Sequence, residues 1–213
     1  MRVDIWSDLV CPWCYLGKRR FDKALSIFTP GAPVDVVHRS FQLDPSLPKG
    51  RSWSAREMLM RKYRMTESEV AAAQHQLEQL AAAEGLEYHL ADSQTGNTMD
   101  AHRLMHLGRA QRMQDVVIER LFGAHFTSNR SLFDAESLMT LGTEAGLTDV
   151  ETMLRGNLYE DAVIADHREA HRLGVRGVPF FLIDGRHAVS GAQSLAVFLD
   201  ALVRASKSQA PLS

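Results

Sequence analysis

Cysteine is scarce in this chain of 213 residues, which contains only Cys11 and Cys14. A framework of structural disulfides is therefore excluded, and any disulfide chemistry must use this one pair. A disulfide closing so short a loop would remove only about 2 kcal/mol of unfolded-state entropy, so it would stabilise the fold little. A structural zinc site would need two further ligands, and neither a second Cys-x-x-Cys nor a histidine pair at finger spacing follows.

Strong net charge and long apolar runs are also lacking. The formal charge of −2 provides no general field for phosphate backbones or anionic lipid, so we expect neither nucleic acid nor a membrane as partner. No segment approaches the ~20 apolar residues of a membrane span, and the first residues contain no signal-peptide core. We therefore expect a cytoplasmic protein, in a compartment where a cysteine pair is more often catalytic than structural.

The first part of the chain has a strand, helix, strand pattern. Residues 3–6 and the β-branched residues 34–41 predict strands, and residues 12–28 predict a helix. Pro12 suits the first helical position, and Thr29-Pro30-Gly31 is expected to end the helix. This order at short spacing predicts a parallel βαβ unit.

Strand composition returns near the C-terminus. Residues 177–183 and 187–190 predict two strands joined by a hairpin at Asp184-Gly185, and residues 193–205 predict a final helix. Between these two ends, residues 51–173 are rich in helix-forming residues and helix-start signals. We therefore predict an α/β chain with two domains: residues 1–50 with 174–213, and an all-helical insertion over residues 51–173.

The cysteine pair lies where the first strand leads into the first helix. Unpaired N–H groups and the helix dipole stabilise a thiolate at this position. Cys11, just before the helix, is predicted to be the exposed nucleophile. Cys14, one turn further on, is predicted to be buried and to resolve the mixed disulfide.

This arrangement resembles the thioredoxin fold, and Cys-Pro-x-Cys combined with a long helical insertion resembles the DsbA family. Four local strings are similar to its FrnE-like subgroup: residues 7–20, 97–103, 174–179 and 190–193. The resemblance implies a protein dithiol-disulfide oxidoreductase or isomerase acting on thiol or disulfide proteins or small molecules. It implies no metal or organic cofactor, with glutathione as a candidate redox partner.

The resemblance also implies which residues form the site. Pro179 would follow a cis peptide bond and lie against the cysteines, which would expose the Val178 backbone for pairing with an extended substrate. From its position alone, Pro179 could equally begin a strand. The implied catalytic residues are Cys11, Pro12, Trp13, Cys14 and Pro179.

Two differences from the better-known oxidases of the family predict that this protein is a weaker oxidant than they are. Trp13 stands where those enzymes have a histidine, which removes one positive charge near the thiolate. Ile5 stands where related proteins commonly place a buried acid, so Asp8 in the following loop is the candidate for proton transfer. We therefore predict a milder oxidant than the periplasmic enzymes.

The insertion offers further candidates for substrate binding. Asn97, His102 and Arg103 match the subgroup's Asn-Thr…Ala-His-Arg string and are predicted to face the cysteines; the alternative is a cap, a packed histidine and a surface arginine. Two histidine pairs have i, i+4 spacing but lack the glutamate of His-Glu-x-x-His, so no metal site is expected. An apolar set is interpreted as a peptide-binding lip or as core: Trp53, Met58, Leu59, Met60, Tyr63 and Met65. A basic set is interpreted as a solvated helix face: Lys18, Arg19, Arg20 and Lys23.

Two other functions stay open. A glutathione-dependent isomerase or transferase of the kappa class shares this insertion architecture, but that class typically has serine where Cys11 stands. A non-catalytic holdase would bind unfolded peptides through the methionine-rich helices.

Overall fold

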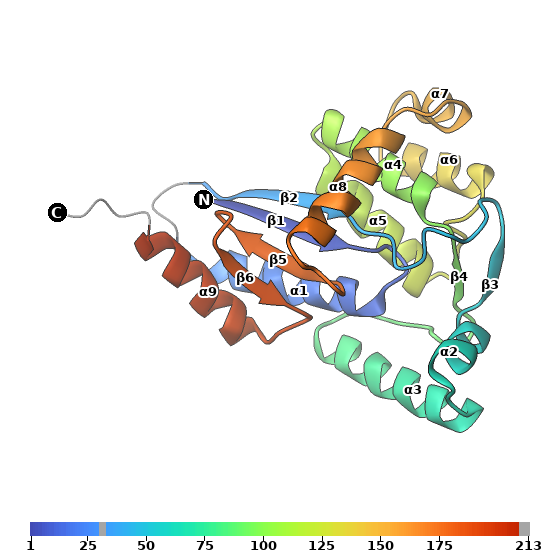
Figure 1. Ribbon diagram of the computed structural model, residues 1–213, viewed down its shortest axis with the longest axis horizontal. Helices are drawn as coiled ribbons and strands as arrows, with labels where there is room; N and C mark the ends of the chain where they lie inside the picture. The colour runs from blue at the N-terminus through green and yellow to red at the C-terminus, as the bar shows by residue number, and fades with distance from the viewer. Residues whose placement is uncertain (30–32, 209–213) are drawn as a thin grey trace. The chain divides into compact units, whose positions relative to one another are not determined.

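The computed structural model describes residues 1–29 and 33–208, which form two compact units (Figure 1). The first unit comprises residues 1–41 and 166–213, and the second comprises residues 42–165. The first unit therefore combines the two ends of the sequence, and the second is an insertion between them.

The elements of the first unit are β1 (Arg2–Ser7), α1 (Pro12–Ile27), β2 (Asp35–Ser40), β5 (Phe180–Ile183), β6 (His187–Ser190) and α9 (Leu195–Ser208). Those of the insertion are β3 (Ser52–Ser54), α2 (Ala55–Tyr63), α3 (Glu67–Ala83), β4 (Gln94–Gly96), α4 (Met99–Ala110), α5 (Gln114–Phe126), α6 (Ala135–Glu144) and α7 (Val150–Arg155). The division between the units falls inside α8 (Glu160–Arg172). Among the described residues, none of these helices is both long and apolar enough to span a bilayer.

The first unit contains a four-stranded sheet in the order β2-β1-β5-β6. β1 pairs in parallel with β2 and antiparallel with β5, and β5 pairs antiparallel with β6. This confirms the predicted βαβ and ββα halves and shows that they share one sheet. The predicted end of the first helix is matched by α1 ending at Ile27, while Pro30 and Gly31 of the expected stop signal lie outside the described residues.

One face of this sheet forms the main apolar core. Alternate residues of a strand point to the same face, so Val3 and Ile5 of β1 pack with Phe181 and Ile183 of β5. The apolar stripes of α1 and α9 cover this face, with Phe21 and Phe198 fully buried against Phe181. This packing fixes the first turn of α1 at the end of β1.

The opposite face is held to the C-terminal half of α8 by a charged residue. Asp166 is buried and accepts hydrogen bonds from Arg39 Nη1 at 2.8 Å and from the Ser40 N–H at 3.0 Å. Burial lowers the pKa of the Arg39 guanidinium, but the carboxylates of Asp4 and Asp166 outweigh this effect and raise it above its ordinary value. The Trp6 indole also donates to the Asp166 carbonyl, so the sheet and this half-helix are joined by polar contacts at a buried position.

Asp166→Ala should therefore destabilise the protein by about 2 kcal/mol, because Arg39 and the Ser40 amide each lose a charged acceptor at a buried position. The matched control is Asp200→Ala, which removes an exposed ion pair with Arg204 on α9 and should cost less than about 1 kcal/mol. Urea unfolding followed by circular dichroism measures both. Equal losses in the two variants would contradict the prediction.

The insertion is built around α4, which is buried along almost its whole length and packs against α5, α6 and α7. α4 ends at Ala110 because Arg112 adopts a left-handed conformation and the Met113 N–H returns to the Gly108 carbonyl. The insertion also contains a two-stranded antiparallel sheet of β3 and β4. The prediction of an all-helical insertion missed this ribbon, because three-residue strands carry almost no periodicity.

The predicted domain limits differ from the observed units by about eight residues at each end. The prediction placed the insertion at 51–173, whereas the second unit comprises 42–165. Gln42 belongs to the insertion because its side chain donates to Asn97 and Thr98. His167 and His171 belong to the first unit, since their rings pack on Phe41 at the end of β2. Composition alone does not mark either of these contacts.

The methionine-rich segment is not a buried core. No residue of α2 is buried, and its apolar side chains are half-exposed, with Tyr63 60% exposed. The helix instead depends on its N-cap, where the Ser54 hydroxyl accepts from the Glu57 N–H, and on packing against α3.

Candidate active site

The two cysteines lie at the N-terminus of α1, directly after β1. Cys11 is the N-cap residue and Pro12 occupies the first turn, as the sequence predicted. The Cys11 N–H donates to the Asp8 carbonyl at 3.1 Å, which forms a tight turn out of the strand. The Cys14 N–H donates to the Cys11 carbonyl at 2.9 Å. This geometry places Cys11 at the N-terminal end of the α1 dipole, where a negative charge is stabilised.

Both cysteines are free thiols in this structure and lie 3.5 Å apart. Cys14 is 1% exposed, as predicted. The prediction of an exposed Cys11 is wrong in degree, since this residue is only 6% exposed. The segment before β5 accounts for part of this burial: the Cys11 Sγ lies 3.7 Å from the Val178 carbonyl oxygen, within reach of a thiol hydrogen bond.

The Val178–Pro179 peptide bond is cis, as the resemblance implied. Pro179 comes directly before β5, and its carbonyl accepts from the Gly191 N–H at 2.8 Å. The Val178 backbone and the Cys11 sulfur lie side by side, although 167 residues separate them in sequence.

The environment of Cys14 holds it as a neutral thiol. Burial raises the pKa of the Cys14 thiol well above its ordinary value, and a hydrogen bond with Cys11 and the charge of that residue act in the same direction. A backbone hydrogen bond from Asp8 lowers the pKa, whereas the charge of the Asp8 carboxylate raises it. Asp8 is itself buried, so its carboxyl group lies away from water.

Trp13 differs from its neighbours in exposure. It is 45% exposed, although Cys11 and Cys14, which flank the Pro12-Trp13 dipeptide, are buried. The surface beside the cysteine pair is therefore aromatic and not cationic at this position.

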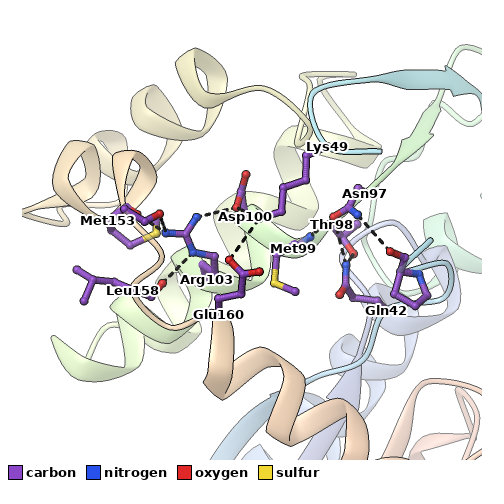
Figure 2. Close-up of polar contacts among 12 residues, drawn as sticks. Gln42, Lys49, Asn97, Thr98, Met99, Asp100, Arg103, Met153, Leu158 and Glu160 are labelled. Carbon is purple, nitrogen blue, oxygen red and sulfur yellow. Dashed lines mark hydrogen bonds and ion pairs between the residues drawn. The ribbon is translucent and has the colours of Figure 1, made fainter. Parts of the chain in front are cut away.

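Asn97 organises the start of the insertion (Figure 2). Its Nδ2 donates to the Leu47 carbonyl at 2.6 Å, and its Oδ1 accepts from the Met99 N–H at 2.9 Å. It thus ties the segment after β2 to the first turn of α4. The substrate-binding role predicted for Asn97 stays a prediction, and these contacts by themselves describe a structural residue.

Arg103 is fully engaged within the insertion (Figure 2). Its guanidinium donates to Leu158 O at 2.8 Å, to Gly156 O at 2.6 Å and to Met153 O, and it pairs with Asp100 at 2.7 Å. The side chain is 2% exposed, which excludes the alternative of a surface arginine.

These contacts favour a structural role for Arg103, as the clamp of the turn between α7 and α8. His102 on the same helix is completely buried. That the two residues face the cysteines stays a prediction.

The two histidine pairs at i, i+4 spacing are candidate metal ligands by that spacing alone, and the structure shows what surrounds them. His167 and His171 approach with their Nε2 atoms 3.0 Å apart, and His106 stacks on Tyr159. Within residues 1–29 and 33–208, no group of three or more histidine, cysteine or acidic side chains has the arrangement of a metal site.

The basic residues of α1 are not a solvated face, contrary to the prediction. Lys18 is buried and pairs with Asp22 at 2.7 Å. Arg19 and Arg20 are half-buried; the first lies over the Tyr15 ring, and the second donates to the Ala192 carbonyl at 2.8 Å. Their charge alone predicted that these side chains are exposed to solvent, but their long aliphatic stems pack along the helix.

A thioredoxin-like sheet with a free dithiol at the first helix and a cis-proline segment beside it defines a class of redox proteins. Residues 2–203 match the model of the DSBA-like thioredoxin domain. The chain belongs to this family, which supports thiol-disulfide oxidoreductase as its enzyme class.

Three relatives illustrate the similarity. A structure described as a probable DsbA oxidoreductase from Streptomyces coelicolor is 44% identical, with a TM-score of 0.95 over 100% of this chain and 93% of that chain. The uncharacterized protein YwbO of Bacillus subtilis is 24% identical over 95% of this chain and 96% of its own. The cytosolic disulfide reductase DsbM from Pseudomonas aeruginosa is 18% identical, with a TM-score of 0.64 over 96% and 99% of the two chains, and it has also been solved with GSH.

Proposed function

We propose that the protein exchanges disulfides with thiol substrates through Cys11 and Cys14. The observation that carries this proposal is the free dithiol at the N-terminus of α1, with the Val178 carbonyl 3.7 Å from the Cys11 sulfur. Cys11 is the residue that meets substrate, because it precedes the helix while Cys14 lies one turn inside it. Val178 presents backbone groups for an extended substrate, and Pro12, Trp13 and Pro179 shape the surface around the sulfur.

In the reducing direction, the Cys11 thiolate attacks one sulfur of a substrate disulfide. The substrate S–S bond breaks, a mixed disulfide forms, and the first substrate thiol leaves with a proton. Cys14 then loses its proton and attacks the Cys11 sulfur, which releases the second substrate thiol. The substrate disulfide is thereby reduced to two thiols, and the Cys11/Cys14 dithiol is oxidised to a disulfide; the oxidising direction is the reverse.

Asp8 is the proposed acceptor of the Cys14 proton. The raised pKa of Cys14 means that resolution needs a base, and the buried Asp8 carboxylate is near enough to act on that pKa. Asp8→Asn should lower the pKa of Cys14, since the carboxylate charge raises it. Thiolate absorbance at 240 nm against pH, in a Cys11→Ser background, measures the change. Asp35→Asn, at the exposed start of β2, is the control, and an unchanged or raised pKa in Asp8→Asn would contradict the assignment.

Glutathione is the proposed recycling partner. Two glutathione molecules would reduce the Cys11–Cys14 disulfide and leave as glutathione disulfide, so neither a metal nor an organic cofactor is required. The fold shared with DsbM, which has been solved with GSH, motivates this choice, and its description as cytosolic motivates a cytoplasmic setting. The FrnE-like subgroup and a milder oxidant than the periplasmic enzymes are part of the same proposal.

The test is capture of the mixed disulfide. Cys14→Ser, incubated with a peptide disulfide, should accumulate a covalent adduct on Cys11 that dithiothreitol releases. Mass spectrometry of the intact protein detects it, and the Cys11→Ser/Cys14→Ser double variant is the control. Failure to capture any peptide thiol would count against the mechanism.

The same variants address the two other functions. Turnover of a glutathione conjugate by Cys14→Ser would favour a kappa-class activity. The half-exposed apolar side chains of α2 favour peptide binding as a second candidate. If the double variant protected unfolded clients as well as the wild type does, that binding would be the primary activity.

A further inference from the structure

Arg20 links the helix that carries the cysteines to a loop from the other end of the sequence. Its Nη1 donates to the Ala192 carbonyl at 2.8 Å, and Ala192 lies in the loop between β6 and α9. Disulfide exchange as proposed above uses neither residue.

The same loop also holds the cis-proline segment. The Gly191 N–H donates to the Pro179 carbonyl at 2.8 Å, and Gly191 has a φ of +83°, a conformation that side chains rarely adopt. One side of the 191–192 loop is therefore bonded to α1 and the other to Pro179. The segment it holds is the one whose Val178 carbonyl lies against the Cys11 sulfur.

Gly17 lets these parts approach closely. A Cβ at this position would lie 2.8 Å from Pro179 Cγ and 3.4 Å from the Cα of Ala192. α1 thus packs against both loops at the turn after Cys14, and the Arg20 bond fastens the contact one turn further along.

We propose that Arg20 is a positioning residue that fixes the Val178 backbone relative to Cys11. The proposal rests on the disulfide-exchange function proposed above, in which an extended substrate pairs with Val178 while its sulfur meets Cys11. A displacement of about 1 Å between such groups can cost as much as a hundredfold in rate. The hydrogen bond from Arg20 to a loop carbonyl, although it is remote from the Cys11 sulfur, thereby controls the rate at which extended peptide substrates react.

The test compares peptide turnover with reaction of a reagent that has no chain to align. Arg20→Met should lower kcat/KM for a peptide-glutathione mixed disulfide about tenfold. The rate at which iodoacetamide alkylates Cys11 should not fall, because this reagent does not use Val178. Arg20→Gln, whose side chain is too short to reach Ala192, should show the same loss of kcat/KM. It replaces Arg20→Met as the test variant if Arg20→Met does not fold. Arg20→Lys should restore turnover, since one N–H donor suffices, and Lys23→Met is the control for lost charge on α1.

The outcomes separate this inference from the function on which it rests. Wild-type turnover with unchanged kcat/KM in both Arg20→Met and Arg20→Gln would overturn the positioning role. A parallel fall in peptide turnover and in alkylation would also overturn it, because it indicates general damage to the fold. No rescue by Arg20→Lys would overturn it as well, because the hydrogen bond to Ala192 would then not be the cause of the loss. Absence of turnover by the wild type itself would overturn the proposed function, and this inference with it.

Discussion

Cys11→Ser is expected to reduce turnover of a disulfide substrate to the rate of glutathione alone. A serine hydroxyl is not ionised at neutral pH and cannot form the S–S bond through which substrate is held. Cys14 cannot take over, because it is 1% exposed and its raised pKa keeps it a thiol. Reduction of a peptide-glutathione mixed disulfide by glutathione, followed by formation of glutathione disulfide, measures the loss.

Cys14→Ser should behave differently at the same site. It keeps the attacking sulfur, so the first step should proceed in a single turnover while release waits for an external thiol. Its steady-state rate should therefore rise with glutathione concentration, whereas that of Cys11→Ser should not exceed the uncatalysed reaction. Equal activity in the two variants, or a covalent adduct on Cys14 in place of Cys11, would reverse the assigned roles.

Arg103→Met is expected to destabilise the protein by about 3–5 kcal/mol, the largest effect on stability outside the cysteine site. Methionine approximates the length of the arginine stem but donates no hydrogen bond. The carbonyls of Met153, Gly156 and Leu158 would each lose a donor in or near the buried interior of the insertion, at about 1–3 kcal/mol apiece when no water replaces it. Urea unfolding monitored by circular dichroism gives the free energy of unfolding.

Arg155→Met is the matched control, because Arg155 is an exposed arginine of the same unit that pairs with Glu151. It should cost less than about 1 kcal/mol. A loss below about 1 kcal/mol in Arg103→Met would contradict the clamp. If Arg103→Met kept its stability but lost peptide turnover, the substrate-binding role predicted from the sequence would be favoured instead.

Local signals predicted the elements that matter most for the site. The β-branched run that forms β2 and the proline after Cys11 act over a few residues, so the βαβ unit and the helix N-terminus could be inferred from them. The cis bond at Pro179 followed from family resemblance alone, because nothing local distinguishes it from a strand start.

Long-range contacts explain what the sequence did not reveal. Arginine is a residue type that is mostly exposed, yet Arg20 and Arg103 both donate hydrogen bonds to backbone carbonyls distant in sequence. Arg20 donates to Ala192, and Arg103 donates to Met153 and Leu158. The burial of Cys11 depends on Val178 in the same way. A charge pattern records neither the partner nor the burial of such side chains, so these roles become visible only when the chain is folded.

The position of the insertion has a consequence for synthesis on the ribosome. Cys11 and Val178 are 167 residues apart, and at about 5–20 residues per second the second half of the site emerges about 8–30 s after the first. During that interval, the sheet lacks β5 and β6, and Cys11 lacks the contact that the Val178 carbonyl provides. The nascent dithiol is therefore open to any oxidant during that interval, and only a reducing compartment would protect it until the last strands are made.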